Sequence, residues 1–238
     1  MLHADDFGLH TSANLAISKM VAAGELGSVS VIVTAGGFGE IKKHLSKLGV
    51  PVFLHFNLTE GRPLSNLESV TTLVDASGHF HSQFVFIARC IFGRVNPRDV
   101  WVELNGQYEA LQKYVAVAGI DSHQHAHAVE PVAKAVVDFA EDRHIEFVRS
   151  YADVRHLHLL TGLFILAYRV FALFSARLHM PASWKKRSWK MFVMASWEKL
   201  DRPLPEGIVA VVHPGTGYDC SEAFAPRVLR HIRHTLAK

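Results

Sequence analysis

Two hydrophobic patterns alternate along the first 150 residues of the chain. Residues 28–34 and 51–56 are short runs of β-branched and aromatic residues, which are typical of buried strands. Apolar residues at spacings of three and four predict a helix that begins near Thr11 or Ser12 and ends before Gly24. This alternation of strand and helix predicts a mostly parallel α/β sheet.

The same patterns predict most of the remaining elements. Helices are expected at about 39–48, 82–93, 97–117, 131–144 and 221–236, and strands at 119–122, 145–149 and 207–212. The polar segment 57–81 between a strand and a helix is long for a compact domain. Loops of this length are usually functional or disordered.

Residues 155–200 break this pattern. Residues 157–180 are strongly apolar, but Arg169 and Arg177 interrupt the run, so a buried or amphipathic helix pair is expected rather than a membrane span. Basic residues at 185–190 lie beside two tryptophans. This leaves peripheral membrane contact through 155–200 open.

Composition favours a single intracellular domain over residues 1–238. The chain is 49% hydrophobic, which is enough for one large core, and its formal charge of +3 is spread along the chain rather than gathered into a nucleic-acid-binding stripe. Its two cysteines form no CxxC pair, and no charged region followed by an apolar run opens the chain. We therefore expect a reduced compartment and a cytoplasmic protein, with the oligomeric state open to a homodimer.

Residues 121–127 hold the densest group of metal-binding side chains. They contain an aspartate and three histidines at alternate positions, His123, His125 and His127. In an extended segment these three rings would point the same way. A surface histidine run is the alternative, but the framing strand and Pro131 favour a site.

Ionisable residues also stand at the carboxyl ends of other predicted strands: Asp5 and Asp6, His55, and His213. Each of these alone has an ordinary explanation, such as a helix cap, a core histidine or an exposed turn. In parallel α/β folds, however, these strand ends lie on one face, where ligands bind. Their convergence predicts one active site.

The residue types at these positions suit metal-dependent hydrolysis. An aspartate and two histidines can hold a metal with water completing its shell, and a neighbouring carboxylate can take a proton from that water. The sequence has no serine or cysteine in a nucleophile elbow, no Gly-rich phosphate loop and no dinucleotide fingerprint.

Four blocks in this order resemble the signature of the YdjC-like (ChbG-type) carbohydrate deacetylases. The blocks are residues 4–8 (ADDFG), 55–61 (HFNLTEG), 121–127 (DSHQHAH) and 213–215 (HPG). The resemblance implies a TIM-barrel-like α/β fold, a divalent metal ion (Mg²⁺ or Zn²⁺), and removal of acetyl groups from N-acetylated amino sugars such as chitooligosaccharides. The apolar and basic region 155–200 departs from the family pattern and leaves a lipid-linked glycan open as the substrate.

The resemblance also implies a role for individual residues. Asp6, His55 and His123 would bind the metal, Asp5 would be the general base, and His213 would be an acid or oxyanion stabiliser. The side chains expected in the second shell or at the substrate are His125, His127, Glu60, Arg62 and Asp121.

Two other departures from the family pattern shape the remaining expectations. Met1 and Leu2 leave almost no strand before the first block, which predicts a distorted barrel that is incomplete at its first strand, and His3 stands where the family usually has asparagine. Two other functions stay open. One is a different metal hydrolase, such as a phosphoesterase or amidohydrolase, and the other is a non-catalytic, membrane-proximal protein of the same fold.

Overall fold

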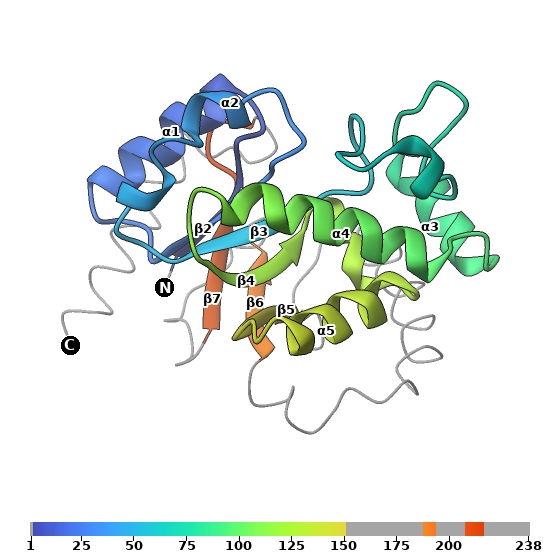
Figure 1. Ribbon diagram of the computed structural model, residues 1–238. Coiled ribbons are helices and arrows are strands. Elements are labelled where there is room, and N and C mark those ends of the chain that lie inside the picture. The colour runs from blue at the N-terminus through green and yellow to red at the C-terminus, as the bar shows by residue number, and fades with distance from the viewer. Residues whose placement is uncertain (1, 151–187, 194–207, 217–238) are drawn as a thin grey trace, which may run out of the picture.

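The computed structural model describes residues 2–150, 188–193 and 208–216 (Figure 1). In order, its elements are β1 (Leu2–Phe7), α1 (Thr11–Ala22), β2 (Ser28–Val31), α2 (Phe38–Ile41), η1 (Leu45–Lys47), β3 (Val52–Phe56), η2 (Leu67–Ser69), α3 (Gln83–Ile91), α4 (Pro97–Gln112), β4 (Val117–Ser122), η3 (His123–Ala128), α5 (Val132–Asp142), β5 (Phe147–Ser150), β6 (Ser188–Val193) and β7 (Ile208–Val212).

The strands form a closed parallel barrel in sequence order from β1 to β7, with the helices outside it. This confirms the predicted barrel-like α/β fold, here with seven strands among the described residues. Every pairing between neighbouring strands is parallel. All strands therefore present their carboxyl ends at the same end of the barrel, where the candidate site residues were expected.

The expectation of an incomplete first strand is wrong. β1 is six residues long and buried throughout. It pairs with β2 through His3 and Ser28 on one side, and with β7 through His3 and Val211 on the other. The two or three residues that precede the first motif are enough, because a barrel strand needs only a few ladder positions to close.

The barrel interior has an apolar layer beneath a polar one. Phe53 stacks on Phe147 with ring centroids 6.3 Å apart, and Gly119 makes room for this pair. A Cβ at Gly119 would lie 2.5 Å from the Phe53 ring. The ring of His3 packs edge-on against Phe53 at 5.1 Å and begins the polar layer above.

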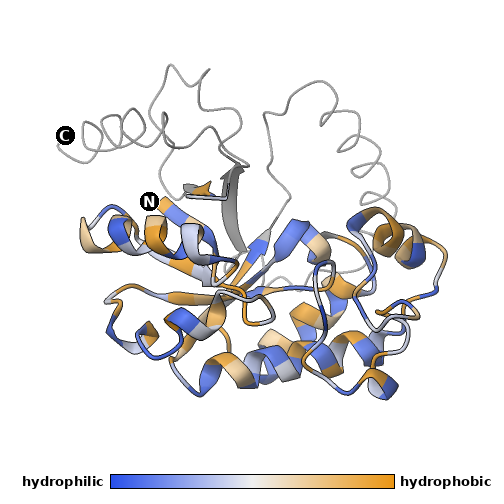
Figure 2. Cartoon of the chain, turned by 90° about the horizontal axis from the view of Figure 1, so that it is seen from above, coloured by the Kyte–Doolittle hydropathy of each residue, from blue (hydrophilic) through white to orange (hydrophobic). Residues whose placement is uncertain are grey.

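Amphipathic helices cover the outside of the barrel, as the mixed hydrophobic and hydrophilic residues of each helix show in Figure 2. α4 begins as its sequence predicts: the Asn96 side chain accepts the Arg98 N–H, and Pro97 occupies the first turn. On α5, Phe139 packs edge-on against Trp101 and Tyr108 of α4, at 5.1 and 5.3 Å. Through these contacts α4 and α5 pack together on the outside of β3 and β4.

Two segments differ from the sequence prediction. The helix expected at 39–48 is two short pieces, α2 and η1, and residues 188–193 of the segment expected to be helical form a strand. β6 has a sequence rich in aromatic and β-branched residues, and it fills the place between β5 and β7.

Other predictions for the second half of the chain fall outside the described residues. They are the helix pair within 157–180, its membrane contact, Cys220 and the terminal helix at 221–236. Cys90 does belong to the core, and burial raises the pKa of its thiol to about 12. Across the described ranges, no helix has both the length and the apolar character needed to cross a membrane.

Candidate active site

Two adjacent carboxylates, Asp5 and Asp6, lie near the carboxyl end of β1. Regular strand alternation would send Asp5 and Asp6 to opposite faces. The pairing of β1 with β2 shifts register between Ala4 and Phe7, and Asp6 has a positive φ of 65°. This bulge turns the Asp6 carboxylate toward the same end as Asp5. The Asn14 side chain of α1 then accepts the Gly8 N–H at 2.8 Å and holds the turn.

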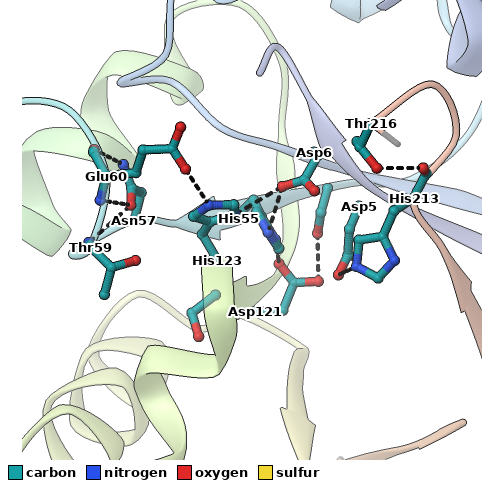
Figure 3. A network of polar contacts seen from close by, with 12 residues as sticks. Asp5, Asp6, His55, Asn57, Thr59, Glu60, Asp121, His123, His213 and Thr216 are labelled. Carbon is teal, nitrogen blue, oxygen red and sulfur yellow. Dashed lines mark hydrogen bonds and ion pairs between the residues drawn. The ribbon is translucent and has the colours of Figure 1, made fainter. Parts of the chain in front are cut away.

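Asp6, His55 and His123 form a compact, buried group (Figure 3). His123 Nδ1 lies 2.9 Å from Asp6 Oδ1, and His55 Nε2 lies 3.3 Å from the same oxygen. One ligand atom from each residue lies within 4.8 Å of the others. The three predicted metal ligands, from β1, β3 and the start of η3, are therefore brought together.

The charge balance around this group suits a bound cation. Asp5, Asp6 and Asp121 are buried carboxylates, and Arg149 is the one buried guanidinium paired with any of them in the described residues. Burial disfavours the charged form of His55, but the carboxylates of Asp5 and Asp121 outweigh it and raise its pKa to about 10. Three buried carboxylates beside one buried guanidinium leave an excess of negative charge, which suits a divalent ion.

His3, Asp5 and Asp121 form a second group with metal-ligand atoms, but a guanidinium already occupies it. Arg149 donates to both oxygens of Asp5, at 2.7 and 2.5 Å, and its Nη2 lies 2.6 Å from Asp121 Oδ2. Burial would raise the pKa of Asp5, yet Arg149 and then His55 hold it well below its usual range. This second group is an ion-pair network rather than a metal site.

Asp121 connects the two groups. Its Oδ1 accepts from His55 Nδ1 at 2.8 Å, so the opposite nitrogen of that ring faces Asp6. Its Oδ2 accepts from Ser30 Oγ at 2.5 Å and lies 3.1 Å from His3 Nε2. Such a carboxylate fixes the orientation of a metal-binding histidine. Asp121 thus lies behind His55, on the side of the ring away from Asp6.

His213 lies above Asp5 at the end of β7. Its Nε2 is 3.6 Å from Asp5 Oδ2, and its carbonyl accepts from Thr216 N–H and Oγ1 (Figure 3). Gly215 has φ +74°, and a Cβ there would lie 2.5 Å from the Ser12 carbonyl. The glycine thus lets the turn pack against the first residues of α1, which fixes His213 over Asp5.

The three histidines of 123–127 do not share a face, so the expectation of an extended segment is wrong. Gln124 and His125 both adopt left-handed conformations, with φ of 49° and 59°. His123 turns to Asp6, and His127 turns away to bond Ser122 Oγ and the Arg149 carbonyl. Left-handed backbone at two successive non-glycine residues costs energy and often marks a functional site.

His125 and His127 are both held neutral. Burial, then the charge of Arg149, lowers the pKa of His125 to about 3. Asp5 opposes this shift, and His213 adds to it. The His125 ring therefore lies close enough to Asp5, the candidate general base, for their charges to interact. Burial lowers the pKa of His127 to about 4. Because the Arg149 carbonyl can only accept, the His127 ring proton lies on Nε2.

The lowered pKa of His127 predicts that the stability of the protein depends on pH. The unfolded ring takes up a proton below about pH 6.5, whereas the folded ring does so only near pH 4. Between these values the unfolded state binds more protons, so the free energy of unfolding falls as the pH falls. From pH 7.5 to pH 5.0, the free energy of unfolding of the wild-type protein is expected to fall by about 2 kcal/mol more than that of His127→Gln. Urea unfolding of both proteins at the two pH values measures this difference.

A matched control is His44→Gln, which changes an exposed histidine. Its free energy of unfolding is expected to follow the wild-type pH dependence. Equal pH dependence for His127→Gln and wild type would contradict a neutral, buried His127.

The two loop residues predicted to contact substrate lie differently. Glu60 Oε2 is 3.0 Å from His123 Nε2, so this carboxylate reaches the metal group directly. Arg62 Nη2 donates to the Ser77 carbonyl at 2.9 Å, within its own loop. The segment 57–81 thus lies beside the site, and its Glu60 contacts one of the proposed metal ligands.

Two residues of this site escaped the sequence prediction. Arg149 ends a predicted strand, and the strand-end argument that selected His55 and His213 applies to it equally. His3 bonds Ser28 Oγ at 2.7 Å and lies 3.1 Å from Ser30 Oγ inside the barrel. Its inward orientation follows from alternation with Asp5, once the barrel is known to close.

Several known proteins are similar to this chain in sequence. A model of the family described as YdjC-like protein matches residues 1–234. A carbohydrate deacetylase from Clostridium beijerinckii is 32% identical over 150 residues, which cover 61% of this chain and 57% of that protein. A chitooligosaccharide deacetylase from Yersinia enterocolitica is 32% identical over 151 residues, covering 60% and 56%. The matches thus span little more than half the length of these relatives.

A solved structure supports the fold. A crystal structure of a protein from Enterococcus faecalis V583, to which cellobiose-phosphate cleavage has been ascribed, matches with a TM-score of 0.64. The match covers 90% of this chain and 80% of that one, at 20% sequence identity. Similarity at this level concerns the architecture of the barrel.

Proposed function

The chain belongs to the YdjC-like protein family, and from this premise we propose that it is a metal-dependent hydrolase that removes acetyl groups from N-acetylated amino sugars. The names of its relatives give the substrate class, and the site gives a means of catalysis. The observation that carries the proposal is the buried group of Asp6, His55 and His123 next to Asp5, which Arg149 holds in place.

The donor set fits a divalent ion. Asp6, His55 and His123 would hold it, and three protein ligands would leave further coordination positions for water and a substrate oxygen. Two imidazole nitrogens favour zinc or a similar transition ion over magnesium, which prefers oxygen ligands. When bound, the ion supplies a Lewis acid that polarises the amide carbonyl and acidifies water.

The protein's own residues supply proton transfer and orientation. Asp5 takes the proton from the attacking water, and the two hydrogen bonds from Arg149 keep its carboxylate fixed and ionised at neutral pH. His213, 3.6 Å from Asp5, delivers a proton to the departing amine or stabilises the developing oxyanion. His125 feels the charges of both Asp5 and His213, and it stays a candidate for substrate contact together with Glu60 and Arg62 of the loop.

The test is release of acetate from N-acetylglucosamine oligomers by purified protein. Treatment with a chelator is expected to lower the rate at least about 100-fold, and Zn²⁺ is expected to restore it. A parallel assay with p-nitrophenyl phosphate separates a deacetylase from a phosphoesterase using the same residues. Acetate release that survives removal of all metal, or hydrolysis of the phosphate ester alone, would contradict the proposal.

A further inference from the structure

Each histidine of the metal group has a carboxylate on its far nitrogen. His55 turns Nε2 to Asp6 and Nδ1 to Asp121. His123 turns Nδ1 to Asp6, at 2.9 Å, and Nε2 to Glu60, at 3.0 Å. A metal at the inner nitrogen requires that nitrogen to lose its proton, so the remaining ring proton would lie on the outer nitrogen. Asp121 and Glu60 are placed to accept those protons.

The two outer carboxylates differ in how they are held. Asp121 is buried in the barrel, where Ser30 and Arg149 fix it. The Glu60 side chain is 50% exposed and stands on the loop after β3. An exposed glutamate loses side-chain entropy when it is fixed in one position, so it can orient His123 only if its backbone is already held.

Asn57 holds the backbone of Glu60. Its Oδ1 accepts the N–H groups of Thr59 and Glu60, both at 3.1 Å, and its Nδ2 donates to the Glu60 carbonyl at 2.6 Å (Figure 3). The same amide donates to Thr34 Oγ1 at 2.7 Å. A single buried side chain thus fixes both polar groups of the Glu60 backbone.

α4 in turn holds Asn57 and the loop. The Gln107 amide accepts the Asn57 N–H at 3.0 Å and donates to the Asn57 carbonyl at 2.7 Å. The Glu103 carboxylate accepts from Leu64 N–H, Ser65 N–H and Gln107 Nε2, at 3.0, 3.0 and 2.7 Å. Glu103 and Gln107 are completely buried. Within the part of the chain that the structure describes, the hydrogen bonds of these two α4 side chains go to the loop and to each other, and none goes to the metal group.

We propose that Glu60 is a positioning residue for the metal: it accepts the outer ring proton of His123 and so aims Nδ1 at the ion, and α4 keeps it there through Gln107 and Asn57. This rests on the metal dependence in the proposed function. It has a consequence for the sugar, since the loop that borders the substrate side then also sets metal affinity. A substrate that moves Glu60 changes how firmly the ion is held.

The test measures metal affinity in the absence of sugar. The dissociation constant for Zn²⁺ is obtained with the full chain by competition with a chromophoric chelator. Glu60→Ala is expected to weaken binding about 10- to 100-fold, the range found for removing such outer partners. Glu60→Gln is expected to fall between Glu60→Ala and wild type, because its amide oxygen can still accept the His123 proton.

Two further variants sharpen the test. Glu68→Ala removes an exposed carboxylate from the same loop and is expected to leave Zn²⁺ affinity unchanged. Gln107→Leu frees the loop without touching the metal group and is expected to weaken binding in the same direction as Glu60→Ala. Circular dichroism checks that each variant is folded, and the Co²⁺ absorption spectrum reports whether the ion's coordination has changed.

The outcomes separate this inference from the proposed function. Wild-type affinity in Glu60→Ala, with a raised KM for the sugar, would make Glu60 a substrate contact and overturn the inference while the proposed function stands. Weakened Zn²⁺ binding in Glu60→Ala, with no acetate released by wild-type protein, would support the inference and contradict the proposed function. A wild-type protein that takes up no divalent ion would overturn both.

Discussion

Asp5→Asn is expected to lower the rate of acetate release about 10²- to 10⁴-fold, the usual contribution of a positioned general base. The asparagine fills the same space but cannot take a proton from water. Asp5 is suited to this role because Arg149 donates to its carboxylate and His213 Nε2 lies 3.6 Å from Oδ2. The measurement is the steady-state rate with N-acetylglucosamine oligomers at saturating Zn²⁺.

Metal affinity is the control for this variant. Because Asp5 is not one of the three proposed ligands Asp6, His55 and His123, Asp5→Asn is expected to keep its Zn²⁺ affinity within about tenfold, less than the loss of an outer partner usually costs. Arg149 loses one ion-pair partner but keeps Asp121, which limits the destabilisation. Asp142→Asn, at the exposed end of α5, serves as a matched substitution. Full activity in a folded Asp5→Asn protein would exclude Asp5 as the base.

His55→Ala is expected to have the largest effect on metal binding. It removes one of three ligands, so Zn²⁺ affinity should fall by more than the roughly 100-fold that marks the upper range for outer partners. His127→Ala makes the comparison, because the sequence places His127 in the same cluster as His123 whereas the structure turns it toward Ser122 and Arg149. Its Zn²⁺ affinity is expected to change less than tenfold.

Competition with a chromophoric chelator ranks the two variants on one scale. If His127→Ala lost as much affinity as His55→Ala, the dense histidine cluster would be the metal site after all. The site would then not be built from three separate strand ends.

Much of the site could be predicted because its residues obey one rule of parallel barrels. Asp6, His55 and His213 each follow a recognisable strand, and the carboxyl ends of parallel strands meet at one end of the barrel. Arg149 obeys the same rule, but an arginine at a strand end has many ordinary roles, and only its contacts with Asp5 and Asp121 distinguish it.

Other features had no local signal. The left-handed turn at Gln124 and His125 contains no glycine, the residue that would have indicated it in the sequence. β6 lies in a segment whose apolar and basic composition suits a helix equally well. The polar layer around His3 depends on barrel closure, which brings Ser28, Ser30 and Asp121 around one ring. Closure is a property of the whole sheet.

The pairing of β1 with β7 also sets an order of assembly. Leu2 pairs with Ala210, so the barrel cannot close until ribosomal synthesis has passed the last described strand. The residues proposed to bind metal all lie within the first 123 positions and can approach one another earlier, whereas His213 arrives with the closing strand. Until then β1 exposes an unpaired edge. The acid and the base of the proposed reaction therefore meet only when the barrel is complete.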